Sequence, residues 1–328
     1  MNHGYLAVDF FFLLSGFVIS HAYDDRWNKL SVKEFFMRRL IRLHPMIIVG
    51  MLVGAICFYP SAAAMFPLVA ETPIWKMILV MLIGFTLIPV TPSMDIRGWQ
   101  EMHPLNGPAW SLFFEYIANI MYALFFRKLS TKMLAVLVFI AGIVLLHFAI
   151  TSEKGDVIGG WSVDALQLQI GFTRLMYPFL AGMLLRKITR PRNIKNAFLW
   201  CTVLIVTALS FPRVGGMENL WANGIYDALV ILFVFPAIVF IGSSGSIRGQ
   251  FMQRVCSFLG DISYPIYIIH FPLVYVFYAW VENNKVPLEK AWPAGIAVFL
   301  TSIFISYIAM KYYDIPFRKW LSARLLKK

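Results

Sequence analysis

The chain has 328 residues, of which 59% are hydrophobic and 14% are charged, and its mean hydropathy is +0.70. This composition excludes a soluble globular domain. Apolar runs of about 17–25 residues recur along the whole length, which is the size needed to span about 30 Å of hydrocarbon. The sequence therefore predicts an all-α, polytopic membrane bundle, because a transmembrane barrel would show short alternating segments instead.

The net charge of +12 is distributed in a way that does not indicate a nucleic-acid partner. The segments between the basic clusters carry few Lys or Arg and most of the loop acids. This alternation follows the positive-inside rule, so the basic charge orients the chain in the membrane. Most of the 29 Lys and Arg fall in five segments: 24–44, 127–132, 186–195, 248–254 and 311–328.

Ten apolar runs are predicted to form helices: 5–22, 46–64, 74–91, 109–126, 132–151, 166–186, 197–211, 225–243, 257–281 and 292–312. The five basic segments must lie on one side of the membrane, so an even number of crossings separates each from the next. Only the interval 45–127 breaks this rule, and Pro60, Pro67 and Pro73 interrupt it. One of the runs 46–64 and 74–91 is therefore expected to be re-entrant or interfacial.

Nine full crossings place the first residue outside and the C-terminus in the cytoplasm. Because most such proteins begin inside, the pattern predicts a spanning helix before Met1 that this sequence lacks. No internal repeat or long linker divides residues 1–328, which predicts a single domain. The three cysteines (Cys57, Cys201 and Cys256) have no CxxC spacing, and no sequence motif indicates a metal site.

Asp9 lies inside the first apolar run, on one helical face with Leu13, Gly16 and Ser20. A carboxylate in a spanning helix is costly and usually functional. The alternative is that Asp9 lies at the outer membrane interface and caps the helix. Gly16 and the neighbouring serines would let another helix approach closely.

Arg38, Arg39 and Arg42 form a basic cluster directly before the second apolar run. Arg39 and Arg42 are three residues apart and share one helix face, where two guanidinium groups could bind a phosphate or diphosphate. The alternative is orientation alone, since arginines are common in any cytoplasmic loop.

The segment Asn106-Gly107-Pro108-Ala109 reads as a turn that enters a helix beginning W-S-L-F-F-E. Ser111 and Glu115 share a face of that helix, and Glu115 could exchange protons or pair with a cation. Arg174 lies within the run 166–186, where an arginine costs about 2.5–3.5 kcal/mol. It should pair with an acid, and Glu115 and Asp9 are the candidate partners.

Ser263, Tyr267 and His270 form a polar stripe within S-Y-P-I-Y-I-I-H. His270 could shuttle protons near neutral pH, or it could be a structural donor, as most lone helical histidines are. The remaining histidines (His3, His21, His44, His103 and His147) lie near segment ends or alone on apolar faces and are not predicted to be functional.

Four segments together resemble the acyltransferase family 3 membrane proteins, which O-acylate surface glycans. They are G-Y-L-A-V-D-F-F-F-L-L-S-G-F-V-I (4–19), F-F-M-R-R-L-I-R-L-H-P (35–45), P-A-W-S-L-F-F-E (108–115) and S-Y-P-I-Y-I-I-H (263–270). Weaker similarities are R-L-M-Y-P-F-L-A-G-M (174–183) and D-I-P-F-R (314–318). Their order and spacing cover nearly the whole chain.

The resemblance implies about ten spanning helices in a bacterial inner membrane, an acyl-CoA donor, usually acetyl-CoA, and a glycan or glycolipid acceptor. The Arg-x-x-Arg of the family maps onto Arg39 and Arg42, which implies donor binding there, with Arg38 beside them. The histidine taken as catalytic in the family lies in the helix that this sequence lacks. Catalytic roles are expected for Glu115, His270 and Asp9, and the expected substrate cavity comprises Trp110, Ser111, Arg174, Ser263, Tyr264 and Tyr267.

Two other interpretations fit the same residues. A transporter or flippase of a lipid-linked or acidic metabolite would use a polar interior for alternating access, although no inverted halves are visible. An inactive, truncated relative would follow from the absent helix. The acceptor, the acyl chain and the oligomeric state are not encoded in any recognisable pattern.

Overall fold

The computed structural model describes residues 2–190, 192–216, 218–247 and 249–326. Within these ranges the chain is helical and contains no strand, which confirms the predicted all-α membrane bundle. The chain forms two compact units. Unit 1 comprises Met1–Leu30, Phe114–Gly160 and Leu166–Gln253, and unit 2 comprises Ser31–Phe113, Trp161–Ala165 and Arg254–Lys328. The assignment of residues 1–328 to a single domain stays a prediction.

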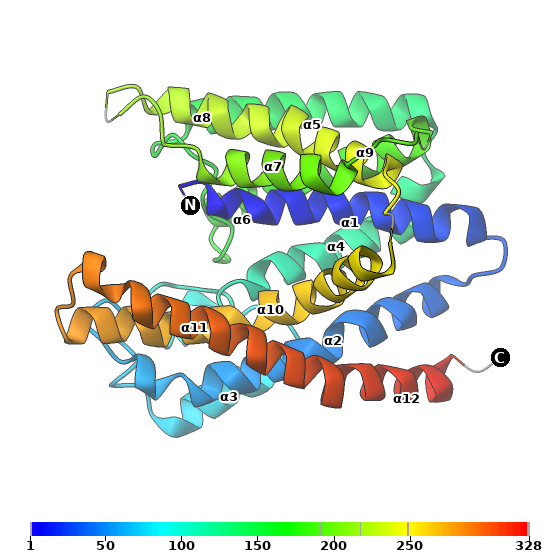
Figure 1. Ribbon diagram of the computed structural model, residues 1–328. Coiled ribbons are helices and arrows are strands. Elements are labelled where there is room, and N and C mark those ends of the chain that lie inside the picture. Colours follow the sequence, from blue (N-terminus) through cyan, green and yellow to red (C-terminus); the bar gives the residue numbers. More distant parts are fainter. Residues whose placement is uncertain (1, 191, 217, 248, 327–328) are drawn as a thin grey trace. The chain divides into compact units, whose positions relative to one another are not determined.

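Unit 1 contains α1 and a series of helices from the middle of the chain. Within it, α5 packs on α8, α7 packs on α9, and α1 packs on α9 (Figure 1). The helix α4 spans Ala109–Leu124, and its part from Phe114 onward also belongs to this unit. The other helices are α1 (Ala7–Tyr23), α5 (Thr131–Thr151), α6 (Ala165–Ile188), α7 (Ala197–Ser210), α8 (Leu220–Leu229) and α9 (Phe235–Ser244).

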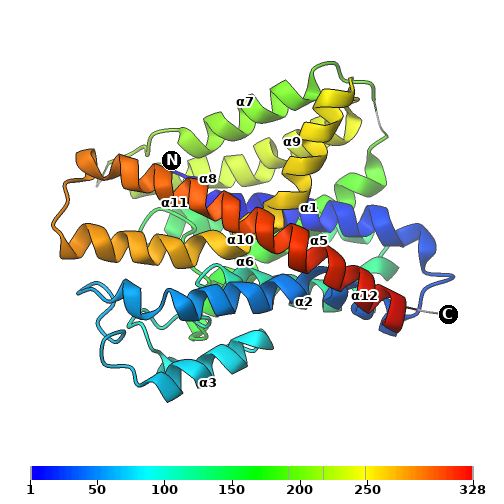
Figure 2. The same ribbon diagram turned by 60° about the horizontal axis from the view of Figure 1, so that its bottom comes forward.

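Unit 2 combines early and late segments of the chain. Its central helix is α2 (Val32–Ile56), against which α3 (Ile74–Phe85) and α12 (Ile315–Leu325) pack (Figure 2). The long α10 (Gln250–Asn283) and α11 (Leu288–Ile308) complete the unit. The basic segment and the apolar run after it form one continuous helix, α2, which passes through Pro45.

Eight helical segments in the described part of the chain are long and apolar enough to cross a membrane. The helices Ile74–Phe85 and Ala197–Ser210 are shorter than a spanning helix. Each of the ten predicted apolar runs contains a helix, but the α-helix ends at Ile56 within the run 46–64 and at Phe85 within the run 74–91. The protein is an integral membrane protein.

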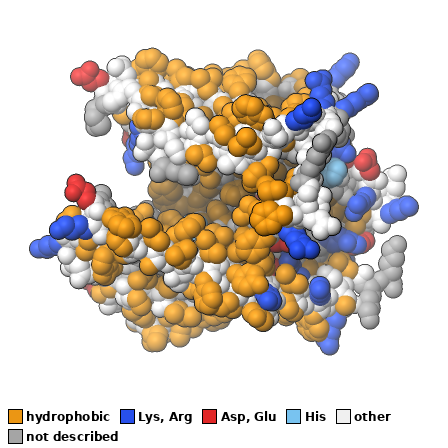
Figure 3. All heavy atoms as spheres, in the orientation of Figure 1, with side chains coloured by type: hydrophobic (Ala, Val, Ile, Leu, Met, Phe, Trp, Pro, Cys, Tyr) orange, Lys and Arg blue, Asp and Glu red, His pale blue; other side chains and the backbone are white. Residues whose placement is uncertain are grey.

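Figure 3 shows that hydrophobic side chains cover the sides of the visible helices, whereas charged side chains lie mainly towards helix ends and loops. Exposed Phe139 and Ile143 on α5 are examples from unit 1, and exposed Phe299 and Phe304 on α11 are examples from unit 2. Such apolar outer faces are stable in contact with lipid tails.

A proline in a helix removes one backbone donor, and at one such place in unit 1 a tyrosine hydroxyl donates to the carbonyl concerned. Pro236, at the start of α9, removes the N–H that would reach the carbonyl of Leu232 in the π-helical turn Val230–Val234. In unit 1 the hydroxyl of Tyr177 donates to that carbonyl at 2.8 Å. This satisfies a backbone oxygen that would be costly to leave bare within the bilayer.

Candidate functional site

Unit 1 contains a buried ion pair between Asp9 of α1 and Arg174 of α6. Nη2 of Arg174 lies 2.6 Å from Oδ2 of Asp9, and Nε donates to Oδ1 at 3.1 Å. The guanidinium also donates to the carbonyls of Gly159 and Tyr5. Asp9 is fully buried, and the prediction that Arg174 pairs with an acid is confirmed.

Two glycines allow α1 and α6 to approach closely enough for this pair. A Cβ on Gly16 would lie 2.0 Å from the carbonyl oxygen of Phe179, and one on Gly182 would lie 2.0 Å from that of Leu13. Each helix therefore places a glycine against the backbone of the other, as small residues do in membrane bundles. The predicted close packing at Gly16 is confirmed.

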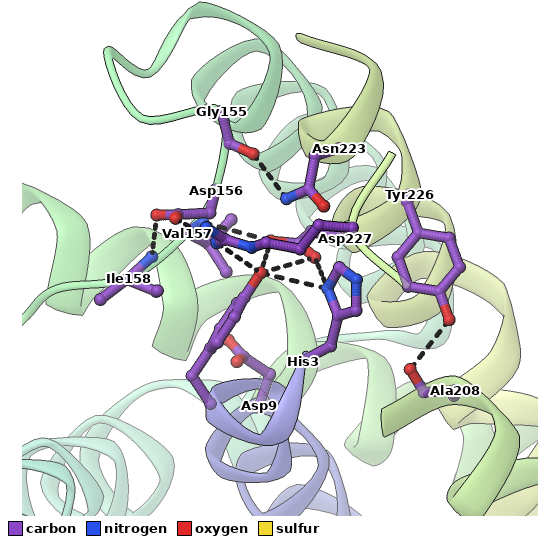
Figure 4. Close-up of polar contacts among 12 residues, drawn as sticks. His3, Asp9, Gly155, Asp156, Val157, Ile158, Ala208, Asn223, Tyr226 and Asp227 are labelled. Carbon is purple, nitrogen blue, oxygen red and sulfur yellow. Dashed lines mark hydrogen bonds and ion pairs between the residues drawn. The ribbon is translucent and has the colours of Figure 1, made fainter. Parts of the chain in front are cut away.

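A second polar cluster in unit 1 surrounds Asp227 of α8 (Figure 4). Nδ1 of His3 lies 2.9 Å from Oδ1 of Asp227, and the hydroxyl of Tyr5 donates to Oδ2 at 2.9 Å. The amide of Val157 donates to the same carboxylate at 3.3 Å. Burial lowers the pKa of His3, which favours the neutral ring.

The Asp227 cluster fastens the start of α1 and the loop after α5 onto α8. Next to it, Arg213 forms an ion pair with Asp156, and Asn223 donates to the carbonyl of Gly155 at 2.7 Å. The sequence did not predict a functional role for His3 or for Asp227. An acid within the apolar run 225–243 was the signal that could have identified the cluster.

Glu115 lies on the part of α4 that belongs to unit 1 and is half-buried. The hydroxyl of Ser15 on α1 donates to its Oε1 at 3.1 Å. Ser111 lies one turn earlier on α4, within the part that belongs to unit 2. The shared helix face of Ser111 and Glu115 is thus divided between the two units.

In unit 2 a hydroxyl pair joins α4 to α10. Oγ of Ser111 and the hydroxyl of Tyr267 are 2.5 Å apart, and the Tyr267 hydroxyl also donates to the carbonyl of Pro108 at 3.0 Å. Tyr264 donates to the carbonyl of Leu43 on α2 at 2.7 Å. Trp110, beside Ser111, is buried. Five of the six residues predicted to line a cavity thus lie in this unit, and Arg174 lies in unit 1. Of the five, Ser111, Tyr264 and Tyr267 link α4, α10 and α2, and Trp110 is buried beside Ser111.

The polar stripe predicted on α10 is only partly an interacting group. Ser263 is exposed and donates to the carbonyl of Gly260 within its own helix. The rings of Tyr267 and His270 lie 6.2 Å apart. Nδ1 of His270 lies 3.0 Å from the carbonyls of both Ile266 and Tyr267, so it carries the proton and Nε2 presents a lone pair.

The basic cluster on α2 contains arginines in different settings. Arg38 is half-exposed and forms an ion pair with Glu34 one turn away, at 2.7 Å. Arg42 is exposed and lies within electrostatic range of Arg39 and of Arg318 on α12. Asp314, which pairs with Arg318 at 2.9 Å, partly balances this charge.

The loop before α4 carries a buried cluster that sequence reasoning missed. Oε1 of Glu101 accepts a hydrogen bond from Tyr275 at 2.6 Å, and the guanidinium of Arg97 lies 3.7 Å from the centre of the Tyr275 ring. Burial raises the pKa of Glu101 to about 7. Burial also lowers the pKa of His103 to about 3, and neither ring nitrogen of His103 has a hydrogen-bond partner among the described residues.

Among the described residues, no group of three or more His, Cys, Asp or Glu side chains is placed to hold a metal ion. The polar groups of the two units are instead hydroxyls, carboxylates, imidazoles and guanidiniums. Such groups can bind phosphate, orient a hydroxyl and accept a proton.

The model of the family described as "Acyltransferase domain" matches residues 2–311. The chain is 25% identical to the peptidoglycan O-acetyltransferase OatA of Listeria monocytogenes, an alignment that covers 96% of the chain and 51% of OatA. It is 24% identical to "Putative O-acetyltransferase SACOL0978" of Staphylococcus aureus (strain COL), over 97% of the chain and 53% of that protein.

A third relative, "Protein 2 in picA locus" of Rhizobium radiobacter, is 29% identical over 43% of the chain and 76% of that protein. The chain thus spans about half the length of the two O-acetyltransferase relatives. No solved structure matches the chain.

Proposed function

Because the chain belongs to the acyltransferase domain family, we propose that it is a membrane O-acyltransferase that moves an acyl group from acyl-CoA to a hydroxyl of a cell-surface or lipid-linked glycan. The family match over residues 2–311 carries this proposal. The similarity to the O-acetyltransferase OatA supports acetyl as the acyl group and a glycan as the acceptor. The chain acts in the bacterial inner membrane.

The donor binds at Arg39 and Arg42 of the basic cluster on α2, together with Arg318 of α12, in unit 2. Arg42 is repelled by both Arg39 and Arg318, and a phosphate or diphosphate offsets that repulsion. The phosphates of CoA are such groups. The positive-inside pattern supports a cytoplasmic position for the basic end of α2 and for the C-terminus, and acyl-CoA is available on that side.

The acceptor hydroxyl attacks the thioester carbonyl with the help of a general base. A C–O bond forms, the C–S bond breaks, and the proton of the hydroxyl passes through the base to the departing CoA thiolate. His270 presents a lone pair on Nε2, and the hydroxyls of Ser111 and Tyr267 can orient an acceptor hydroxyl in the same unit.

The polar residues of unit 1 have different roles. Glu115 is proposed as an acid or base, since it is half-buried and accepts a hydrogen bond from Ser15. Asp9 accepts two hydrogen bonds from Arg174, which also donates to two backbone carbonyls, so this pair holds α1 and α6 in register for the reaction.

The test is acetyl-CoA binding to the purified protein in detergent. The double variant Arg39→Ala/Arg42→Ala is compared with the wild type and with Arg190→Ala/Arg192→Ala, which removes the same charge from an exposed segment of unit 1. Binding that is lost only in the first double variant supports the donor site. Equal binding by both double variants, or none by the wild type, contradicts the proposal.

A further inference from the structure

The loop between α3 and α4 is buried where it enters α4. Every residue from Glu101 to Gly107 is buried although none of them is helical. The loop lies against α2, where a Cβ on Gly54 would be 2.2 Å from the carbonyl oxygen of Leu105. Irregular backbone buried in a membrane bundle must have its polar groups satisfied by neighbouring side chains.

One end of this buried segment is fixed by Arg97, Glu101 and Tyr275. Nε of Arg97 donates to the carbonyl of Pro104 at 2.9 Å, and Nη1 donates to Ser61 at 2.9 Å. The guanidinium stacks on Tyr275, whose hydroxyl donates to Glu101. These contacts tie the loop to α10 and to the residues that follow α2.

The other end is fixed by Asn106 and Pro108. The side-chain amide of Asn106 donates to the carbonyl of Ile268 at 2.8 Å, and the carbonyl of Pro108 accepts from Tyr267. Tyr267 in turn contacts Ser111. The position of the loop therefore determines where the Ser111–Tyr267 hydroxyl pair lies.

Gly107 lies in the turn at one end of the loop and contacts Glu101 and Tyr275 at the other end. A Cβ at Gly107 would lie 2.5 Å from the hydroxyl of Tyr275 and 2.6 Å from Oε1 of Glu101. The backbone of the turn is thus in direct contact with the Glu101–Tyr275 hydrogen bond. A change in that hydrogen bond must displace the turn, because tightly packed interiors transmit small shifts.

We propose that Glu101 is a positioning residue, whose contacts with Tyr275 and Gly107 hold the 106–108 turn in place and thereby set the Ser111–Tyr267 hydroxyl pair for the acceptor. The role rests on the proposed acyl transfer. Glu101 itself lies beneath the turn and acts through it.

Because the pKa of Glu101 is raised, its role can be tested by the pH dependence of activity and of loop exchange. The groups that face Glu101 are Arg97 and Asp95 from its own loop and Tyr275 from α10, and Oε2 lies 3.8 Å from Nε of Arg97 without a hydrogen bond. Burial disfavours the carboxylate and raises the pKa of Glu101 to about 7. The neutral form is thus favoured below that pH, and above it the folded state holds a buried charge.

The experiment compares wild type, Glu101→Gln, Glu101→Ala and the control Glu282→Gln at pH 6 and pH 8. Glu282 also lies in unit 2, but it is exposed and accepts from the amide of Met65. One readout is kcat and KM for CoA release from acetyl-CoA with digested peptidoglycan as the acceptor. The other is hydrogen–deuterium exchange of residues 95–108, compared among variants at the same pH.

We expect Glu101→Ala to lower kcat about tenfold or more at both pH values with little change in the KM for acetyl-CoA, because a displaced site loses rate before donor affinity. Glu101→Gln should match the wild type at pH 6, and at pH 8 it should show higher kcat and slower exchange than the wild type. Glu282→Gln should follow the wild type throughout.

Identical pH dependence in wild type and Glu101→Gln for both readouts would overturn the proposal, as would a wild-type kcat in Glu101→Ala. If the wild type releases no CoA, the proposed acyl transfer fails. The exchange measurement then decides by itself whether Glu101 holds the turn.

Discussion

The side-chain amide of Asn106 donates a 2.8 Å hydrogen bond to the carbonyl of Ile268, in the middle of α10. Pro272, four residues further along, has no N–H to offer that carbonyl. A residue of the loop before α4 thus completes the hydrogen bonding of a helix 162 positions away in the sequence. The same arrangement joins Tyr177 to the carbonyl of Leu232 in unit 1.

Replacing Asn106 with Ala should destabilise the protein by about 1–3 kcal/mol, because the carbonyl of Ile268 is then buried without a donor. Thermal unfolding in detergent measures the loss. Asn284→Ala is the matched control, since Asn284 is exposed and donates to the carbonyl of Trp280 within its own helix. An equal loss of stability in both variants would show that the hydrogen bond to Ile268 stabilises the protein no more than an exposed one does.

Removing one member of the Asp9–Arg174 pair should cost about 3–5 kcal/mol, because an uncompensated charge remains buried. The double variant Asp9→Leu/Arg174→Met should cost less than either single change, since it leaves no buried charge. Thermal unfolding in detergent of the two single variants and the double variant measures the coupling. The exposed pair Glu34–Arg38 is the reference and should show less than about 1 kcal/mol.

Gly16→Ala should destabilise unit 1 by about 1–3 kcal/mol, because its Cβ would overlap the carbonyl of Phe179 and push α1 from α6. Gly260→Ala on α10 is the control, as no atom lies within 4 Å of its Cβ position. Alanine there should be neutral or stabilising, since glycine weakens helices. Unfolding temperatures that fall equally for both would argue against the close helix contact.

His103 should make the protein sensitive to acid. Its pKa is lowered from 6.5 to about 3 by burial, so between these values the unfolded chain binds a proton that the folded protein does not. The contribution of His103 to stability should fall by about 1.4 kcal/mol for each pH unit below about 6.5, whereas the raised pKa of Glu101 contributes in the opposite direction between about pH 7 and 4.5. The effect of His103 is therefore read from the difference between the wild type and a variant. His103→Leu should lose this dependence, and His147→Leu, at an exposed position on α5, should keep it. Unfolding temperatures at pH 7 and pH 5 give the comparison.

The sequence alone determined the architecture of the helices and one of their contacts. Apolar run length identifies membrane helices because hydrocarbon thickness fixes it. The cost of a lone guanidinium in the bilayer required an acid for Arg174, and Asp9 is that acid. Both predictions depend only on the segment itself, because its length must match the hydrocarbon thickness and its charge must be paired whatever the neighbouring helices are.

The sequence did not determine the partners of side chains in loops and at segment ends. His3 meets Asp227 across 224 positions, and Tyr275 meets Glu101 across 174. Helical periodicity correctly placed Ser263 and Tyr267 near one face, but only packing decided that Tyr267 contacts Ser111 while Ser263 remains exposed. Loops have no periodicity, so the burial of Glu101, His103 and Asn106 depends on which helices surround them, and that is a property of the tertiary structure.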